Sequence, residues 1–136
     1  MRQLIVFAIT LLLAACSNSA PPKSFSFVEA TIDDIHGAIA DGTMSCVDIV
    51  KGYLRRIETY DQASGMNSII FTNPAAIEKA QAIDERIANG VSLGPLYCIP
   101  VLLKDNFDTS DMPTSGGSIA LKDSVPPDDA FMVKKL

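Results

Sequence analysis

A lysine at the end of an apolar run is the residue best placed for chemistry in this sequence. The run Ile99–Leu103 predicts a strand covered on both faces, and Lys104 follows it directly. Burial at that place would favour the neutral amine, which could accept a proton and serve as the base for a serine nucleophile. Asp105 and Asn106 could hydrogen-bond around the amine. By spacing alone, a solvated lysine with Asp105 starting a turn is the commoner arrangement.

Other catalytic patterns are incomplete in this chain. Ser-x-x-Lys, the nucleophile elbow G-x-S-x-G and the phosphate-binding patterns G-x-x-x-x-G-K and G-x-G-x-x-G do not occur. The loop Ser115–Ser118 could expose amides as an anion cradle, but a glycine turn is expected instead. Asp105, Asp108 and Asp111 resemble a calcium loop that lacks its glycine and its later glutamate, so a solvated acidic loop is expected.

The single histidine and the three cysteines exclude several classes of site. His36 cannot form a multi-histidine metal site, makes a Ser-His-Asp triad improbable, and is expected on a helix, at the surface or partly buried. Three cysteines are too few for a disulfide scaffold or a four-cysteine zinc site. In an oxidising compartment Cys46 and Cys98 could form a disulfide, although two small buried thiols are expected. The sequence therefore predicts no metal and no cofactor.

Two helices are expected before the lysine segment, each with a capping residue. Thr31 can cap a helix over residues 32–40, whose first turn carries acidic residues that suit the helix dipole. Ser45 can cap a second helix that runs to about Tyr60, and Asp48 completes its Ser-x-x-Asp start. The apolar face of the second helix consists of Val47, Val50, Leu54 and Ile57.

Helices and short strands then alternate, which favours an α/β fold. Strands are expected at 68–71 and 99–103, and a third helix at 74–88 that ends at Asn89-Gly90. A last helix is expected after Pro126-Pro127, capped by Asp128 or Asp129. Two short strands do not make a sheet that could be covered on both faces, so the sequence reads as the opening part of a larger α/β domain.

The composition is that of a globular domain. The 136 residues suggest one small domain, and 48% hydrophobic and 20% charged residues argue against general disorder. A net charge of −5 with a pI near 4.6 gives no electrostatic support for nucleic-acid binding. The sequence contains no apolar run long enough to span a bilayer.

The N-terminus has the parts of an export signal. Residues 1–15 combine a basic start, a short apolar core and small residues. Leu13-Ala14-Ala15-Cys16 resembles a bacterial lipobox, in which the cysteine is lipidated and the preceding residues are removed. We expect residues 1–15 to be a lipoprotein signal peptide and residues 16–26 a flexible tether. Lipid on Cys16 would anchor the protein to a membrane surface of the cell envelope, on the periplasmic or extracellular side.

The lysine segment also carries a family resemblance. Residues 94–106 read GPLYCIPVLLKDN and are followed by Asp108-Thr109, Met112-Pro113-Thr114 and Gly117-Ser118. This long, ordered block closely resembles the amidase signature family, and the resemblance extends over about residues 27–136. One position departs from the family pattern, because Cys98 stands where glycine is usual before Ile-Pro.

The resemblance implies an amidase with a mixed β-sheet covered by helices. Members of the family hydrolyse carboxamide bonds with a Ser-cisSer-Lys triad, in which the lysine corresponds to Lys104. Both triad serines lie well downstream of the lysine, so Ser115 and Ser118 do not correspond to them. Residues 27–136 are therefore expected to be the N-terminal part of an amidase domain, inactive alone and completed by later sequence or by a second polypeptide.

Two functions follow from these expectations. The first is an exported, lipid-anchored amidase that acts on a peptide or small-molecule amide. The second is a non-catalytic envelope lipoprotein or binding module derived from the amidase N-terminus. Export argues against the tRNA-dependent amidotransferase branch of the family, which works in the cytoplasm.

Overall fold

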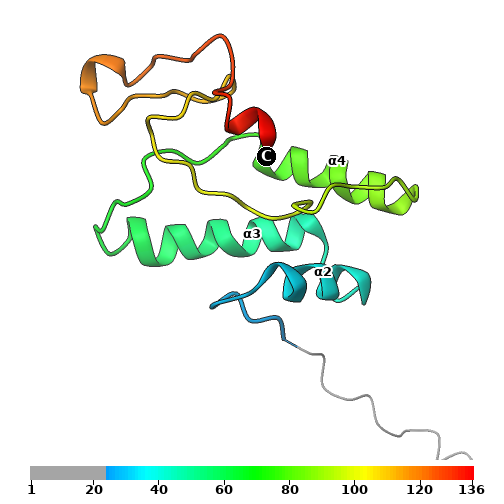
Figure 1. The fold of residues 1–136 in the computed structure, drawn as a ribbon. Helices are drawn as coiled ribbons and strands as arrows, with labels where there is room; N and C mark the ends of the chain where they lie inside the picture. Colours follow the sequence, from blue (N-terminus) through cyan, green and yellow to red (C-terminus); the bar gives the residue numbers. More distant parts are fainter. Residues whose placement is uncertain (1–23) are drawn as a thin grey trace, which may run out of the picture.

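Three α-helices form the ordered centre of the molecule in a computed structural model that describes residues 24–136 (Figure 1). They are α2 (Ile32–Ala40), α3 (Cys46–Arg56) and α4 (Ala76–Ala88). A π-helical turn, η2 (Ile57–Gln62), continues α3, and two short 3₁₀ turns follow α4, η3 (Ile119–Leu121) and η4 (Val133–Lys135). None of the helices in residues 24–136 has both the length and the apolar character needed to cross a membrane.

Capping boxes start α2 and α3 where the sequence predicts them. The Thr31 hydroxyl accepts a hydrogen bond from Asp34 N at 3.1 Å, and the Asp34 carboxylate accepts one from Thr31 N at 2.9 Å. Ser45 and Asp48 repeat this arrangement at the start of α3, with 3.0 Å in both directions. Each box satisfies amides that the first turn of a helix leaves without partners.

A second carboxylate, from another helix, completes the start of α3. Asp84 of α4 accepts hydrogen bonds from the amides of Cys46 at 2.8 Å and Val47 at 3.1 Å. The negative charge also lies at the positive end of the α3 dipole. Asp84 therefore fixes the C-terminal half of α4 against the N-terminus of α3.

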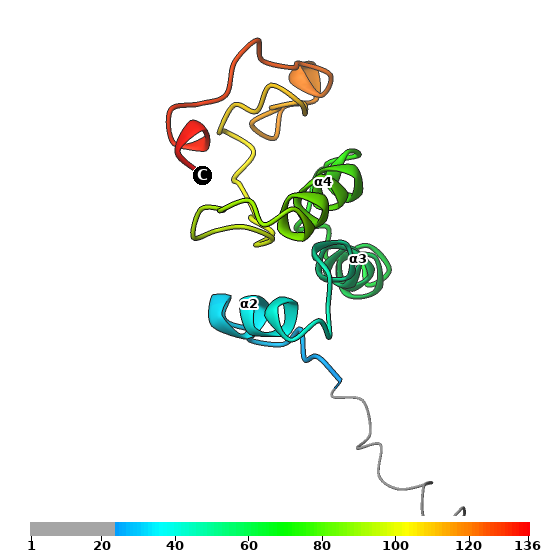
Figure 2. The same ribbon diagram turned by 90° about the vertical axis from the view of Figure 1, so that its right-hand side faces the viewer.

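The core lies between α3 and α4, which run side by side in opposite directions (Figures 1 and 2). Cys46, Ala80 and Cys98 are its buried centre. The partly buried residues packed against them include Val47 and Val50 of α3, and Ile83 and Ile87 of α4. Val47 and Val50 belong to the apolar face that the sequence predicts for α3, so the packing confirms this part of the face.

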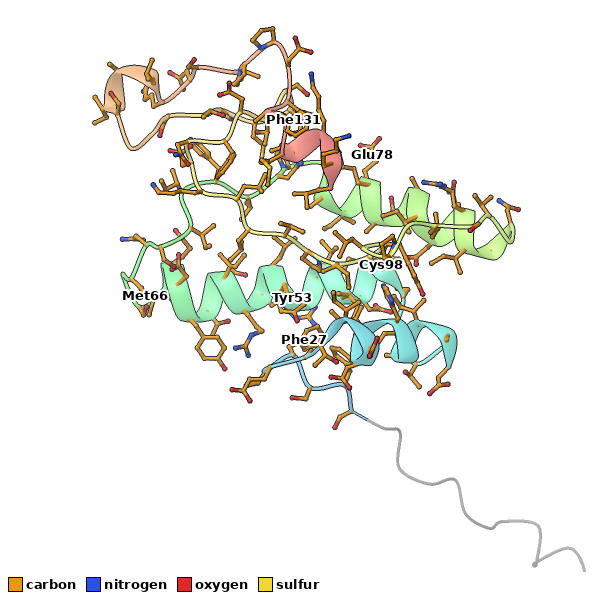
Figure 3. All side chains as sticks on the ribbon, in the orientation of Figure 1. Phe27, Tyr53, Met66, Glu78, Cys98 and Phe131 are labelled. Atoms are coloured by element: carbon orange, nitrogen blue, oxygen red, sulfur yellow. A yellow bond between two sulfur atoms is a disulfide. The ribbon has the colours of Figure 1, made fainter. Side chains whose placement is uncertain are left out.

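The segment before α2 crosses the outer side of α3, where Gly52 makes room for it. The Phe27 ring lies so close to the Gly52 backbone that a Cβ atom there would be 2.1 Å from Phe27 Cζ. Phe27 also packs edge-on against Tyr53, with ring centroids 5.3 Å apart (Figure 3). Phe27 is therefore part of the packed structure, directly after the tether predicted over 16–26.

Neither expected strand forms within residues 24–136. Residues 68–71 and 99–103 have no ladder partner in this part of the chain, and most of their side chains are exposed. A strand needs a neighbour to satisfy its backbone groups, and the sequence pattern does not supply one by itself. The mixed sheet therefore remains an expectation from the resemblance.

Two helix boundaries also differ from the prediction. α4 begins at Ala76 rather than at Pro74, and Asn73 instead closes a turn by accepting a hydrogen bond from Ala75 N at 2.9 Å. The last helix is only the short turn η4, because Asp129 does not cap it but binds the amide and hydroxyl of Ser110 at 2.7 and 2.8 Å.

Candidate active site around Lys104

Lys104 lies at the surface of the described part of the chain. Its side chain is exposed, as are those of Val101, Leu102 and Leu103 before it. No hydrogen bond or ion pair joins its amine to another residue within 24–136. This is the commoner arrangement expected from the spacing. The burial that would favour a neutral amine is not seen in this part of the chain, because residues 99–103 have no strand partner here.

The backbone around Lys104 is nevertheless well defined. The Lys104 carbonyl oxygen accepts hydrogen bonds from the amides of Asn106 at 2.7 Å and Phe107 at 3.0 Å. These bonds close a tight turn directly after the lysine. The chain thus reverses at Lys104 and presents its amine outward.

Asp105 ties this turn to the glycine loop that follows ten residues later. Its carboxylate accepts hydrogen bonds from the Ser115 hydroxyl, from Ser115 N at 2.9 Å and from Gly117 N at 3.2 Å, and its backbone oxygen accepts one from Gly116 N at 2.7 Å. The bond from the Ser115 hydroxyl is the main reason that the pKa of Asp105 lies below its ordinary value of 3.8. The ionised Asp105 carboxylate therefore links the turn after Lys104 to the glycine loop, and this set of hydrogen bonds is here called the Asp105 staple.

These contacts bear on two interpretations from the sequence. Asp105 could have hydrogen-bonded around the Lys104 amine, but its carboxylate binds the glycine loop instead. The loop is a glycine turn, as expected, with positive φ at Gly116 (56°) and Gly117 (76°). The amides of Ser115 and Gly117 bind the Asp105 carboxylate, and those of Gly116 and Ser118 bind backbone carbonyl oxygens. These four amides are therefore not open to an external anion.

Asp111, in the same acidic loop, binds partners other than those of Asp105. Asp111 accepts hydrogen bonds from Lys79 Nζ and, at 2.7 Å, from Asn73 Nδ2, and the Lys79 bond is the main reason that the pKa of Asp111 is lowered. Both bonds tie the loop to the segment around α4. A shallow hollow of about 310 Å³ lies beside this contact and is lined in part by Lys79, Leu103, Ser110 and Asp111. Lys104 does not line it.

Two contacts fix the chain six or seven residues before Lys104. Cys98 is bonded to Cys46 by a disulfide, with the two Cα atoms 5.1 Å apart (Figure 3). The expectation of two free thiols is therefore wrong. His36, half-buried on α2 as expected, stacks on the Tyr97 ring with centroids 3.9 Å apart, and its Nε2 lies 3.0 Å from the Tyr97 carbonyl oxygen.

The sequence offered the Cys46–Cys98 disulfide only as the less favoured alternative, and it did not indicate the other contacts. Cys46 and Cys98 are 52 residues apart, and such a spacing says nothing about distance. The same holds for His36 with Tyr97 and for Asp105 with Ser115. The one local indication of a special contact at Cys98 was that this cysteine stands where the family pattern has glycine.

Comparison with known proteins gives a consistent result. The model of the family described as Amidase matches residues 48–136. The chain belongs to the Amidase family. A Schizosaccharomyces pombe protein named as a putative amidase is 40% identical over 116 residues, which are 84% of this chain and 19% of that protein. A glutamyl-tRNA(Gln) amidotransferase subunit of Streptomyces coelicolor is 34% identical over 110 residues, which are 80% of this chain and 22% of that protein.

Solved Amidase-family structures share the fold of this chain. The native peptide amidase of Stenotrophomonas maltophilia superposes with a TM-score of 0.77 and 34% identity, over 83% of this chain and 23% of that enzyme. The chain thus spans about a fifth of the length of the curated relatives it matches. The predictions of a lipoprotein signal peptide over 1–15, of lipid on Cys16 and of most of the tether fall outside the described residues.

Proposed function

We propose that this chain supplies the general base of an amidase, and that Lys104 is that base. The supporting observation is membership of the Amidase family over the segment that contains Lys104. The geometry is compatible with the role, because the Lys104 side chain is exposed. The turn that follows the lysine is held by the hydrogen bonds of Asp105, the next residue. An amine with no partner within residues 24–136 is available to groups that come from elsewhere.

The proposed reaction needs two serines in addition to Lys104. The neutral amine of Lys104 takes the proton of a bridging serine, which takes the proton of the nucleophilic serine as its oxygen attacks the amide carbon. The C–N bond then breaks, the proton passes to the leaving nitrogen, and an ester remains on the serine. Water cleaves this ester by the same route, giving a carboxylic acid and the restored serine.

We place these serines outside residues 24–136. Ser115, the buried serine nearest to the lysine in sequence, is bound to Asp105 through its hydroxyl and amide. The chain covers only 19–22% of two relatives that it matches. The remaining parts of the triad are thus to be sought in further sequence of the same protein or in a second polypeptide, and this chain alone is proposed to be inactive.

Exposed apolar side chains support a larger domain around these residues. Leu102 is 75% exposed and Phe131 73% exposed, although both are large apolar side chains. Val101, Leu103 and Met132 extend the exposed apolar surface beside them. A self-contained binding module would be expected to bury more of this surface. We therefore favour the amidase over the non-catalytic lipoprotein.

The proposal is tested with the complete protein and a panel of peptide, aryl and aliphatic amides. Ammonia or amine release is measured for the unaltered protein, Lys104→Ala and Lys104→Arg. Both variants should lose at least a hundredfold in kcat, since arginine keeps the charge but cannot act as a neutral base. The matched control is Lys122→Ala, an exposed lysine that forms a loose ion pair with Asp123 at 3.8 Å. Retained activity in Lys104→Ala would exclude the proposed base.

We also propose that the protein is a lipoprotein of the cell envelope, anchored through Cys16. The support is the lipobox-like sequence Leu13–Cys16 and the adjacent apolar core. The unaltered protein should enter the detergent phase in a phase-separation assay, and Cys16→Ser should not. A Cys16→Ser protein that still enters the detergent phase would disprove the lipid anchor.

A further inference from the structure

Cys98 has a backbone conformation that side chains rarely adopt. Its φ is 58°, in the left-handed region that glycine enters without steric cost. This accounts for the glycine that the family pattern has at the same place. A residue with a Cβ atom is held in such a conformation only when its surroundings determine it strongly.

The surroundings of Cys98 provide that constraint. Its side chain is bonded to Cys46, and the exposed fractions of the two residues are 6% and 0%. Cys46 is itself the first residue of α3, where its amide is bound by Asp84 and the preceding Ser45 caps the helix. The disulfide thus joins Cys98 to the most firmly bonded helix end in the described structure.

A second contact holds the neighbouring residue. The Tyr97 ring lies flat on His36, with an angle of 6° between the rings, and the Tyr97 carbonyl oxygen is within hydrogen-bond distance of His36 Nε2. Side chain and backbone of Tyr97 are therefore both bound to α2. Residues 97 and 98 form one anchor, attached to α2 and α3.

Lys104 stands between this anchor and the Asp105 staple. The residues from Val101 to Leu103 are exposed and have no backbone hydrogen bonds within residues 24–136, so they do not fix the lysine themselves. The place of Lys104 is therefore set by its two flanking attachments, Cys98 upstream and Asp105 directly downstream. Loss of the bond would free the upstream end and leave the turn after Lys104 held by the Asp105 staple alone.

We infer that the Cys46–Cys98 disulfide positions Lys104 for its reaction. This inference rests on the proposed function of Lys104 as the base. The two cysteines touch no reacting atom and act only through the segment that leads to the lysine. The predicted signature is a loss of kcat with little change in KM, beyond any loss of stability.

The kinetic test uses the complete protein, with the bond verified by peptide mapping. Cys46→Ala and Cys98→Ala should each lower kcat about tenfold or more, with KM changed less than about threefold, at a temperature where melting curves show every variant folded. Cys98→Gly also removes the bond but suits the left-handed backbone, so its kcat should fall less than that of Cys98→Ala. A phosphine reductant, which converts the bond to two thiols, should lower kcat of the unaltered protein and leave that of Cys46→Ala unchanged.

A second measurement separates this inference from the amidase proposal. Hydrogen exchange is followed at the amides of Asn106 and Phe107, which bond to the Lys104 carbonyl, before and after reduction. Exchange there should accelerate at least fivefold, while the amides of Ser68 and Ile69, bound to Asp61, should change little. Equal acceleration at both places, or none at Asn106 and Phe107, would overturn the inference whether or not an amide is cleaved. Folded alanine variants with unchanged kcat would overturn it as well.

Discussion

Gly52 shows how one missing side chain determines local packing. It lies inside α3, where glycine is unfavourable, yet its lack of a Cβ atom lets the Phe27 ring rest on the helix backbone. Phe27 in turn contacts Phe25 and Tyr53 edge-on. The position of the chain before α2 therefore depends on this glycine.

Alanine substitutions at two helical glycines should have opposite effects. Gly52→Ala should lower the free energy of unfolding by about 1 kcal/mol, because displacement of Phe27 outweighs the gain in helix propensity. Gly37→Ala, in α2 with nothing within 4 Å of its Cβ position, should raise it by about 0.5–1 kcal/mol. Urea unfolding of both variants checks this. If Gly52→Ala instead raised the free energy of unfolding, the contact of the Phe27 ring with the α3 backbone would not contribute to stability.

Asp61 is a buried carboxylate whose hydrogen bonds link η2 to the segment after it. It accepts hydrogen bonds from the Ser68 hydroxyl, from Ser68 N at 2.8 Å and from Ile69 N at 3.2 Å. The hydroxyl of Ser68 is the main cause that lowers the pKa of Asp61 below 3.8. Its ionised form is thus favoured in the folded protein.

The stability contributed by Asp61 should depend on pH. Since its pKa is lower in the folded than in the unfolded protein, the contribution is complete above about pH 5 and is lost as pH falls through 3.8 toward the folded pKa. Asp61→Asn should therefore be less stable at pH 7 and lose less stability on acidification. Unfolding free energies between pH 7 and pH 3 measure both effects. Ser68→Ala, which keeps the backbone donors, should fall between the two proteins, and equal pH slopes in all three would refute the assignment.

At the scale of elements, local sequence predicted helix starts much better than strands. The capping boxes at Thr31 and Ser45 need only residues three positions apart, so the sequence contains all of their determinants. A strand depends on a partner, and residues 68–71 and 99–103 find none within 24–136. The hydrogen bonds from α3 to Asp84 could not be predicted either, because Asp84 is separated in sequence from its two partners by 37 and 38 positions.

For the candidate site, too, local sequence indicated the lysine itself but not the tertiary contacts that hold it. Lys104 could be selected from its place after an apolar run, and the motif around it indicated the family that the comparisons confirm. The anchors of the site could not be predicted, because Cys46, His36 and Ser115 reach their partners only through the tertiary fold. The sequence left both a buried and a solvated Lys104 open, because burial depends on what covers the run before it.

The contact between Asp84 and α3 should have a measurable effect. Asp84→Ala leaves the amides of Cys46 and Val47 without their acceptor and should lower the free energy of unfolding by about 1–2 kcal/mol. Glu85→Ala, the next residue of α4 with an exposed side chain, is the control and should change it by less than about 0.5 kcal/mol. Chemical unfolding of both variants measures these changes. Equal decreases in the free energy of unfolding of the two variants would contradict the stabilising role of Asp84.

At the scale of the whole molecule, apolar surface is unevenly distributed. The buried core lies around α3 and α4, whereas many large apolar side chains after residue 100 are exposed, among them Leu102, Ile119 and Phe131. Some exposed apolar side chains also precede residue 100, such as Met66. Much of residues 100–136 is irregular and lies to one side of the helices in Figure 1. The amidase proposal assigns this surface to contacts with the rest of the domain.

Expressed alone, residues 24–136 should bind a hydrophobic dye strongly and self-associate. Leu102→Lys should reduce both properties, because this side chain is 75% exposed. The same substitution in the complete protein should lower its melting temperature if the leucine is covered there. Dye fluorescence, sedimentation and melting curves provide the readouts. A dye-free monomer of residues 24–136 would instead favour the binding-module alternative.

The bond between Cys46 and Cys98 has a topological consequence. It closes a covalent ring that contains α3, η2 and α4, so a protease that cuts once between residues 57 and 75 cannot release either piece. The nicked protein would migrate as one band without reductant and as two bands with it. A ring of this size also lowers the conformational entropy of the unfolded chain, which in the chain-entropy model raises the free energy of unfolding by about 4 kcal/mol. A cut between residues 98 and 104 lies outside the ring and breaks the covalent link between the ring and the segment that carries Lys104.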